Sequence, residues 1–463
     1  MRGCNAKALS KEASVSLVPS FLELLQPLSC VFTAPTFANF LTVLGGWAFA
    51  PRRTVTGMIL AAGAVGTRDA KHRAKHHSAY HRLFSAARWS LDELGLAVFG
   101  LILPLVPGVV LLAVDDTLAR KRGLKVFGVG MHHDPLLSTR KTAVMNWGHC
   151  WVALGVVLRL PCCGDRWFCL PVLFRLYVPR KTADRKKLPY KTKPRLAVQM
   201  LELLCERHEN RRFHAVGDSA YGGKSVLLNL PRNCDLTSRL KMDARLYDQV
   251  IEPKGRKRAK GGRPRKRGRR LPTPEQMLAG RCRRLALDIY GRHDTGRVAE
   301  TVARCYADPD RPLKVVAADP LTGGRKPQAF FSTCPHDTAQ ALLTRYACRW
   351  PVEVMNHDVK GQLGFEQPQG WSEEAVRRTA PVAMLLYSLV VLWFGREGHK
   401  HCRVPLRPWY ATKTPGPAGA SFAEMLSTLR AQSVREEVLS MGLHGKGSRN
   451  VLDAFIHVVK LAA

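Results

Sequence analysis

The chain has 463 residues, of which 72 are lysine or arginine and 36 are aspartate or glutamate, so its formal net charge is 72 − 36 = +36. A chain of this length can form two or three domains with an ample core. The charge exceeds what solubility requires and indicates a polyanionic partner. Nucleic acid is favoured over a membrane, because the basic residues are spread over several segments without a lipid-anchor motif. The 13 cysteines are scattered and include no CxxC pair, which argues against a zinc site and favours a reducing cytoplasm.

The N-terminal part, to about residue 95, is expected to be helical, and no signal peptide is expected because no apolar core follows the first charges. Residues 54–63 and 69–84, joined by a turn, resemble a helix–turn–helix. The second of these helices carries several basic residues and four histidines. Contact with a DNA backbone is favoured there over a metal site formed by the i,i+4 pair His72 and His76.

An apolar run of 19 residues from Leu96 to Val114 is long enough to mimic a membrane span. Two prolines interrupt the run, and Asp115 and Asp116 follow it, so we expect a buried helix, a turn and a central strand that ends at these acids. A second apolar strand, FHAVG, ends at Asp218. Acids at strand ends also form turns and cap helices, so each one alone is weak evidence for a site.

Between these acids the pattern predicts both strands and a helix, as in a mixed α/β fold. Strand-like segments fill residues 108–178, and a helix at 194–208 leads to the strand before Asp218. Residues 180–195 hold eight lysines or arginines against one aspartate, and we expect either a surface loop over DNA or a plain solvated loop. The apolar segment 382–394 is too short to span a bilayer and is expected to be a core helix.

The 135 residues that separate Asp218 from Glu353 are too many for a simple connection. A tract at 254–270 holds eleven lysines or arginines in 17 residues and no acid, so it cannot pack as a core. Its centre contains Arg263 and Arg265 and resembles an AT-hook, although non-specific phosphate binding is the favoured interpretation. Strand-like segments flank this tract at 234–241, 283–291, 313–319 and 328–333.

The segment YACRWPVEVMNHDVK, residues 346–360, carries polar side chains at offsets of −7, −4, 0 and +7 from its glutamate, namely Tyr346, Arg349, Glu353 and Lys360. On one continuous helix they would lie within roughly 60° of arc. A carboxylate beside basic groups and a phenol suits a metal ion next to a phosphate, whereas the alternative is a solvated face with i,i+4 ion pairs. Pro351 predicts a kink, or a new helix that begins there with Glu353 in its first turn.

These motifs together resemble those of the DDE transposases of bacterial insertion sequences, in the branch marked by Tyr-x2-Arg-x3-Glu-x6-Lys. The first-acid motif is similar to Asp115-Asp116-Thr117, and the second to Asp218-Ser219-Ala220-Tyr221. The resemblance covers about residues 14–395. The doubled aspartate leaves the first ligand open; Asp115 is favoured because Asp-x-Thr then fits, and Asp116 is the alternative.

The resemblance implies an α/β fold with a ribonuclease H-like catalytic core, a β-rich insertion domain and a helical N-terminal DNA-binding region. The expected boundaries are 1–95 for the N-terminal region, 96–235 and 335–395 for the core, 236–334 for the insertion with its basic tract 254–270, and 396–463 for a basic C-terminal region.

The resemblance further implies a transposase that binds the terminal inverted repeats of its element and catalyses DNA cleavage and strand transfer. Asp115 or Asp116, together with Asp218 and Glu353, would hold two Mg²⁺ or Mn²⁺ ions, and Tyr346, Arg349 and Lys360 would contact DNA phosphates. The partners would be double-stranded DNA and a second copy of the chain on paired ends, in a bacterial cytoplasm at the nucleoid and without a membrane. The alternatives are a catalytically inactive DNA-binding derivative and a metal-dependent nuclease that only hydrolyses.

Overall fold

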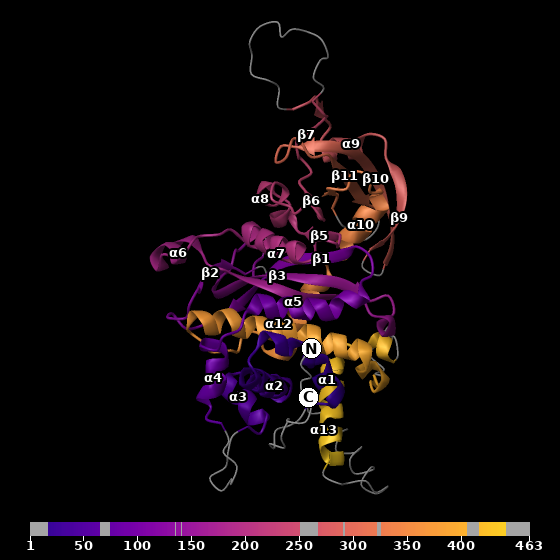
Figure 1. Cartoon of the computed structure of the whole chain (residues 1–463). Coiled ribbons are helices and arrows are strands. Elements are labelled where there is room, and N and C mark those ends of the chain that lie inside the picture. The colour runs from indigo at the N-terminus through magenta and orange to yellow at the C-terminus, as the bar shows by residue number, and fades with distance from the viewer. Residues whose placement is uncertain are drawn as a thin grey trace.

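The computed structural model of the chain describes residues 17–64, 75–134, 136–139, 141–250, 267–289, 292–321, 326–404 and 416–440. A large mixed sheet crosses the middle of the molecule, with helix α7 on one face and helices α5 and α12 on the other (Figure 1). The N-terminal helices and α13 form a helical region below this layer, and most strands of residues 236–334, the expected insertion, continue the sheet above it (Figure 1). The molecule is therefore a mixed α/β structure with a helical base.

The helical base is built from both ends of the chain. Arg430 on α13 donates to the carbonyl oxygen of Ala48 at 2.6 Å, and Ser433 accepts from the backbone N–H of Val18 at 3.0 Å. The C-terminal helix therefore packs on the N-terminal helices. The helices of this base are α1 (Pro19–Leu25), α2 (Ala34–Phe49), α3 (Val55–Ala61), α4 (Ser78–Ser85) and α13 (Phe422–Ser440).

The predicted helix–turn–helix corresponds to α3 and α4. In the described part of the chain the second helix begins at Ser78, later than the expected start, and residues 65–74, including His72, lie outside the described residues. Tyr80 is 4 % exposed and belongs to the core. The prediction of a helix pair is thus confirmed for the described part, with a shorter second helix.

The long apolar run before Asp115 forms helix α5 (Leu91–Ile102), a short 3-10 turn at Leu103–Leu105 and strand β1 (Val110–Arg120), as predicted. Strand β1 does not end at the acids, however. It continues to Arg120, because its second half pairs with β3 (Met145–Arg159) in antiparallel register. Asp115 and Asp116 therefore lie inside a strand, and the prediction that it ends there is wrong.

Strand β1 lies inside the sheet, between β3 and β5. It pairs in parallel with β5 (Phe213–Gly217), which pairs in parallel with β6 (Cys234–Leu240). On the other side β3 pairs with β2 (Gly130–His133) and with β4 (Trp167–Tyr177), both antiparallel. Helix α7 (Lys193–Arg207) connects β4 to β5. The basic segment 180–195 is not a plain loop, because α6 (Arg180–Lys186) forms within it.

The strands of the expected insertion, residues 236–334, extend the same sheet. Strand β6 pairs on its other edge with β12 (Gln328–Ser332), so the core strands and the insertion strands form one 12-stranded sheet. The four predicted strand segments are confirmed as β6, β9, β11 and β12, whereas the long strand β10 has no counterpart among the predictions. The remaining elements here are β7 (Leu246–Tyr247), β8 (Arg270–Leu271), α9 (Pro274–Ala279), β9 (Arg283–Ile289), β10 (Arg292–Cys305), β11 (Leu313–Pro320) and α10 (Ala339–Ala347).

Helix α12 (Glu373–Arg396) forms much of the core below the sheet. Among the described helices it is the one long and apolar enough to cross a bilayer by length and composition, but 89 % of its most apolar window is buried inside the protein. Ser388 on this helix donates to the carbonyl oxygen of Pro171 at 2.9 Å, which ties α12 to β4. The expected core helix at 382–394 is confirmed. The short four-residue helix α8 (Lys224–Leu227) completes the upper face of the core.

Two histidines at one end of the core strands are buried in the neutral form. His149 is 1 % exposed, and its Nε2 donates to the carbonyl oxygen of Phe127 at 2.8 Å. Burial lowers the pKa of His149 to about 4, and burial likewise lowers the pKa of His132 to about 4. In the unfolded chain both would titrate near their ordinary value of about 6.5.

We therefore expect these two histidines to lower the stability of the fold as the pH falls from about 6.5 to about 4, because the unfolded state takes up protons first. Each histidine should contribute on the order of 2–3 kcal/mol to this loss. Urea unfolding at about pH 7.5 and about pH 5 would measure this loss of stability. His149→Gln should reduce the loss of stability between the two pH values. His357→Gln, at a side chain that is 87 % exposed, should leave that loss unchanged. An equal loss of stability in both variants would contradict the assignment of His149 as a buried, neutral histidine.

Candidate active site

The parallel pairing of β1 with β5 places two of the predicted acids side by side. The last pair in this register is Val114 with Gly217, and Asp115 and Asp218 are the next residues on each strand. Paired residues on neighbouring strands point to the same face of a sheet, so both carboxylates extend from one face. The negative charge of Asp218 is among the influences that raise the pKa of Asp115, which agrees with this placement.

Asp218 stands at the end of its strand, as predicted. It caps the short 3-10 helix η4 (Ser219–Tyr221), and its Oδ1 accepts from the backbone N–H of Ala220 at 2.8 Å. Gly217 immediately before it has no room for a side chain, because an added Cβ would lie 2.8 Å from the Cβ of Tyr221. The close approach of η4 to the strand end therefore requires glycine at this position.

Arg349 joins the third acid to the first. Its guanidinium Nη1 lies 3.2 Å from Asp115 Oδ2, and its Nη2 lies 2.5 Å from Glu353 Oε1. The side chain of Arg349 is 13 % exposed, against 17 % for Asp115 and 37 % for Glu353. Two carboxylates that are far apart in the sequence thus share one buried cation.

The local structure around Arg349 follows from Pro351. Helix α10 ends at Ala347, and a new helix, α11 (Pro351–Leu363), begins at the proline with Glu353 in its first turn. This is the second of the two expected outcomes for Pro351, so the kinked continuous helix is excluded. The positive dipole end of α11 favours a carboxylate at Glu353.

Asp115 is the acid whose ionisation the fold opposes most. Burial raises its pKa to about 7, with smaller upward contributions from Asp116 and Asp218, while Arg349 opposes the rise. The pKa of Arg349 is raised by Asp115 and Glu353, although its own burial acts in the other direction. The site therefore holds more negative charge than one guanidinium balances, and it favours a further positive charge.

Asp116 points to the opposite face of the sheet. Its Oδ2 lies 2.6 Å from Lys193 Nζ at the start of α7, and its Oδ1 accepts from Tyr221 Oη at 2.9 Å. The thiol of Cys150 also donates to Oδ2 at 3.3 Å. Because Tyr221 belongs to the turn that Asp218 begins, Asp116 fixes the position of that turn against β1. The structure thus separates the doubled aspartate, with Asp115 towards Arg349 and Asp116 towards Lys193.

The predicted phosphate-binding residues do not lie together on one helix. Tyr346 lies on α10, 7 % exposed, with its ring 4.6 Å from that of Phe330. It therefore does not share one helix with Glu353, and the expected single face is wrong. Lys360 lies in the last turn of α11, where burial lowers its pKa. Arg263 and Arg265 lie outside the described residues.

Sequence reasoning gave no role to Lys193 or Asn356. Lys193 sits in a basic segment, and nothing in its spacing indicates a contact with Asp116. Asn356 lies one turn after Glu353 on α11, and its buried Oδ1 has no hydrogen-bond partner among the described residues. An unpaired buried acceptor on this helix favours a hydrogen-bond donor or a cation nearby.

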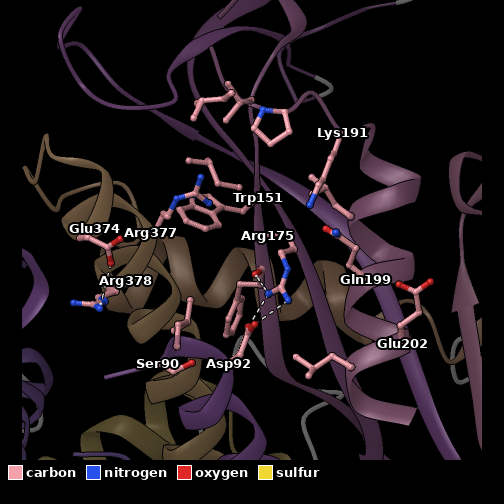
Figure 2. A pocket seen from close by; sticks show the side chains of 18 of the residues that line it. Ser90, Asp92, Trp151, Arg175, Lys191, Gln199, Glu202, Glu374, Arg377 and Arg378 are labelled. Atoms are coloured by element: carbon pink, nitrogen blue, oxygen red, sulfur yellow. Dashed lines mark hydrogen bonds and ion pairs between the residues drawn. The ribbon is translucent and has the colours of Figure 1, made fainter. Parts of the chain in front are cut away.

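A pocket of about 720 Å³ lies elsewhere, beside strand β4. Figure 2 shows Trp151, Arg175 and Arg377 among its lining residues, with Arg175 paired to Asp92. None of the three predicted acids of the metal site lines this pocket. Two ion pairs join its lining residues, Arg175 with Asp92 and Arg378 with Glu374. Because the predicted acids lie elsewhere, the pocket is not the candidate active site.

The chain matches a known family. Residues 28–295, more than half of the chain, match the sequence model of a family described as DDE superfamily endonuclease. The matched range contains Asp115 and Asp218, whereas Glu353 lies beyond it and is linked to the site through Arg349. No curated protein matches the chain.

The two adjacent aspartates should respond in opposite ways to the loss of charge. Asp115→Asn should raise the free energy of unfolding at pH 8 by about 1–3 kcal/mol, because ionised Asp115 is disfavoured by burial in the folded protein. The gain should shrink as the pH falls below about 7, where Asp115 becomes protonated in the folded state. Asp116→Asn should instead cost about 1–3 kcal/mol, because Lys193 loses its partner.

Urea unfolding of both variants at pH 8 and pH 5 would test this pair. If Asp115→Asn were destabilised and Asp116→Asn stabilised, the assignment of Asp115 to Arg349 and of Asp116 to Lys193 would be reversed.

Proposed function

Because the chain belongs to the DDE superfamily of endonucleases, we propose that it is a DNA transposase, which cuts the ends of its own element and joins them to a target. The observation that carries the proposal is the ion pairing of Arg349 with both Asp115 and Glu353, beside Asp218 at the end of the neighbouring parallel strand. Endonucleases of this superfamily depend on a divalent metal, and three carboxylates from distant segments are the ligands that such chemistry needs.

The donor set fits Mg²⁺ or Mn²⁺. All three proposed ligands are carboxylates, and hard divalent cations prefer oxygen. Glu353 is 37 % exposed, so the site is open to solvent on one side, and Arg349 supplies the positive charge between the acids. Asp115, Asp218 and Glu353 would hold two ions. The bound metal supplies Lewis-acid activation of the attacking oxygen and charge stabilisation at the leaving oxygen.

The basic side chains near the acids would position the DNA. Arg349, relieved of its ion pairs by a competing cation, has donors in a fork that matches phosphate oxygens. Lys360 lies seven residues beyond Glu353, about 10 Å further along α11, where it can contact a neighbouring phosphate. The assignment of Asp115 rather than Asp116 as ligand is supported by the pairing of Asp116 with Lys193.

The strand order supports a ribonuclease H-like core. Strands β4, β3 and β1 are antiparallel neighbours, and β5 and β6 continue in parallel after the crossover through α7. The insertion, with its basic tract 254–270, and the helical N-terminal region would bind the DNA on either side of this core. One chain carries one such triad, so two paired ends require two copies, most simply around a two-fold axis.

The metal requirement tests the catalytic assignment. Purified protein should cut DNA that carries the ends flanking its coding frame in Mg²⁺ or Mn²⁺, and should bind without cutting in Ca²⁺. Asp115→Asn, Asp218→Asn and Glu353→Gln should each lower cleavage by at least about 100-fold, since removing a ligand costs more than removing an outer partner.

DNA affinity of these variants should stay within about 3-fold, since the phosphate contacts remain. Asp165→Asn, at a side chain that is 97 % exposed, is the matched control and should cut normally. Cleavage in excess chelator, or normal cleavage by a triad variant, would refute the assignment.

Strand transfer separates a transposase from a nuclease that only hydrolyses. A duplex with a pre-cut 3′-hydroxyl at the element end, mixed with supercoiled plasmid and Mg²⁺, should yield a covalently joined product on a denaturing gel. The joining should disappear in Glu353→Gln. Hydrolysis of both DNAs without any joined product would identify a nuclease instead. Binding without cleavage by the wild-type protein would identify an inactive derivative.

A further inference from the structure

A second group of metal-binding side chains lies at the base of the insertion. His214 on β5, Asp235 on β6 and Cys334 just after β12 each offer one ligand atom, and these atoms all lie within 4.8 Å of one another. None of the three belongs to the proposed carboxylate site. His214 is four residues before Asp218 on the same strand, so the two groups occupy different levels of the sheet.

Strand register, and not a loop conformation, brings these residues together. His214 pairs with Asp235 in the parallel β5–β6 ladder. In the antiparallel β6–β12 ladder Ser332 pairs with Thr237, so Cys334, two residues further on, lies opposite Asp235. Side chains at paired positions share a face of the sheet, and the three are therefore held on one face by the backbone ladder itself.

Neighbouring side chains hold the group in place. His214 Nε2 lies 2.7 Å from Thr237 Oγ1. Asp235 Oδ1 accepts from Thr333 Oγ1 at 3.0 Å, and its Oδ2 lies 3.1 Å from Arg212. Hydrogen bonds of this kind orient metal ligands in known sites and fix the free ring nitrogen of a ligating histidine. The nearby cation Arg345 is paired with Asp337 at 2.6 Å, which compensates its charge.

We propose that His214, Asp235 and Cys334 bind one Zn²⁺ ion that joins the end of the insertion to the core strands β5 and β6. A thiolate, an imidazole and a carboxylate suit zinc and not magnesium, which prefers ligands that are all oxygen. Three protein ligands leave the fourth tetrahedral position to water. The thiol of Cys334 loses its proton to solvent on binding, so the ion carries two positive charges into a site that supplies two negative ones.

The position of this site suggests a structural role. Cys334 is the point where the chain returns from the insertion, and His214 lies on the strand that ends at Asp218. A metal at this point would fix the insertion against the strand that carries one catalytic acid. The site would therefore act on stability and on the geometry of the insertion, independently of Mg²⁺ at the carboxylates.

Cobalt binding to the full-length protein tests the proposal. After the metal-free protein has been prepared with chelator and reductant, Co²⁺ should bind and give a near-ultraviolet thiolate-to-cobalt charge-transfer band that saturates at one equivalent. Zn²⁺ should abolish the band, and excess Mg²⁺ should not. Cys334→Ser should lose the band, and the double variant Asp115→Asn/Glu353→Gln should keep it, which separates this site from the carboxylate site.

Two further variants keep the test decisive if Cys334→Ser folds poorly. Thr237→Val removes only the hydrogen bond to His214 and should weaken Co²⁺ binding by about 10-fold or more. Cys282→Ser changes another cysteine of the insertion, whose thiol donates only to backbone carbonyls, and should leave binding unchanged. Absence of a thiolate band in the wild type, a full band in Cys334→Ser, or displacement by Mg²⁺ would each overturn the proposal.

Discussion

Arg349 is bonded to Asp115 on strand β1 and to Glu353 on helix α11, and the arrangement of the candidate site depends on these two contacts. A guanidinium that is only 13 % exposed needs carboxylate partners, because an unpaired buried charge is strongly destabilising. The two acids in turn need this cation, since burial already raises the pKa of Asp115. The ion pairs therefore anchor the turn between α10 and α11 to the sheet, and they bring together segments that the sequence separates widely.

The same region shows how a fold can hold a site that is unfavourable for stability. Asp115 and Asp218 extend from one face of neighbouring parallel strands, so their charges repel each other. Asp116 offsets part of this cost on the other face, where Lys193 and Tyr221 bind it and hold the turn after Asp218. Unbalanced negative charge of this kind is expected where a bound cation supplies the missing positive charge. The electrostatic pattern thus agrees with an endonuclease family that uses divalent metals.

The continuity of the sheet links the insertion to the same site. Because β6 pairs with both β5 and β12, the insertion is attached through a backbone ladder instead of a flexible linker. Movement of the insertion would therefore act on β5 and on Asp218 at its end. The cluster of His214, Asp235 and Cys334 lies at this junction, where a bound ion would stiffen the attachment most effectively.

Local signals in the sequence determined several features without the tertiary structure. Pro351 predicted either a kink or a helix start with Glu353 in its first turn, and the second of these is found. The apolar run before Asp218 predicted a strand end, and the charge of +36 indicated a polyanionic partner. Each of these depends on neighbours in the chain: a proline that lacks an N–H, a run of β-forming residues, or the sum of charges. The tertiary structure alone decided which of Asp115 and Asp116 faces Arg349, that β1 continues beyond them, and that Cys334 lies opposite Asp235. The alternation of side chains between the two faces of a strand follows from the local backbone. Which distant strands and helices pack against each face is decided elsewhere in the chain, and no residue spacing within one segment encodes it.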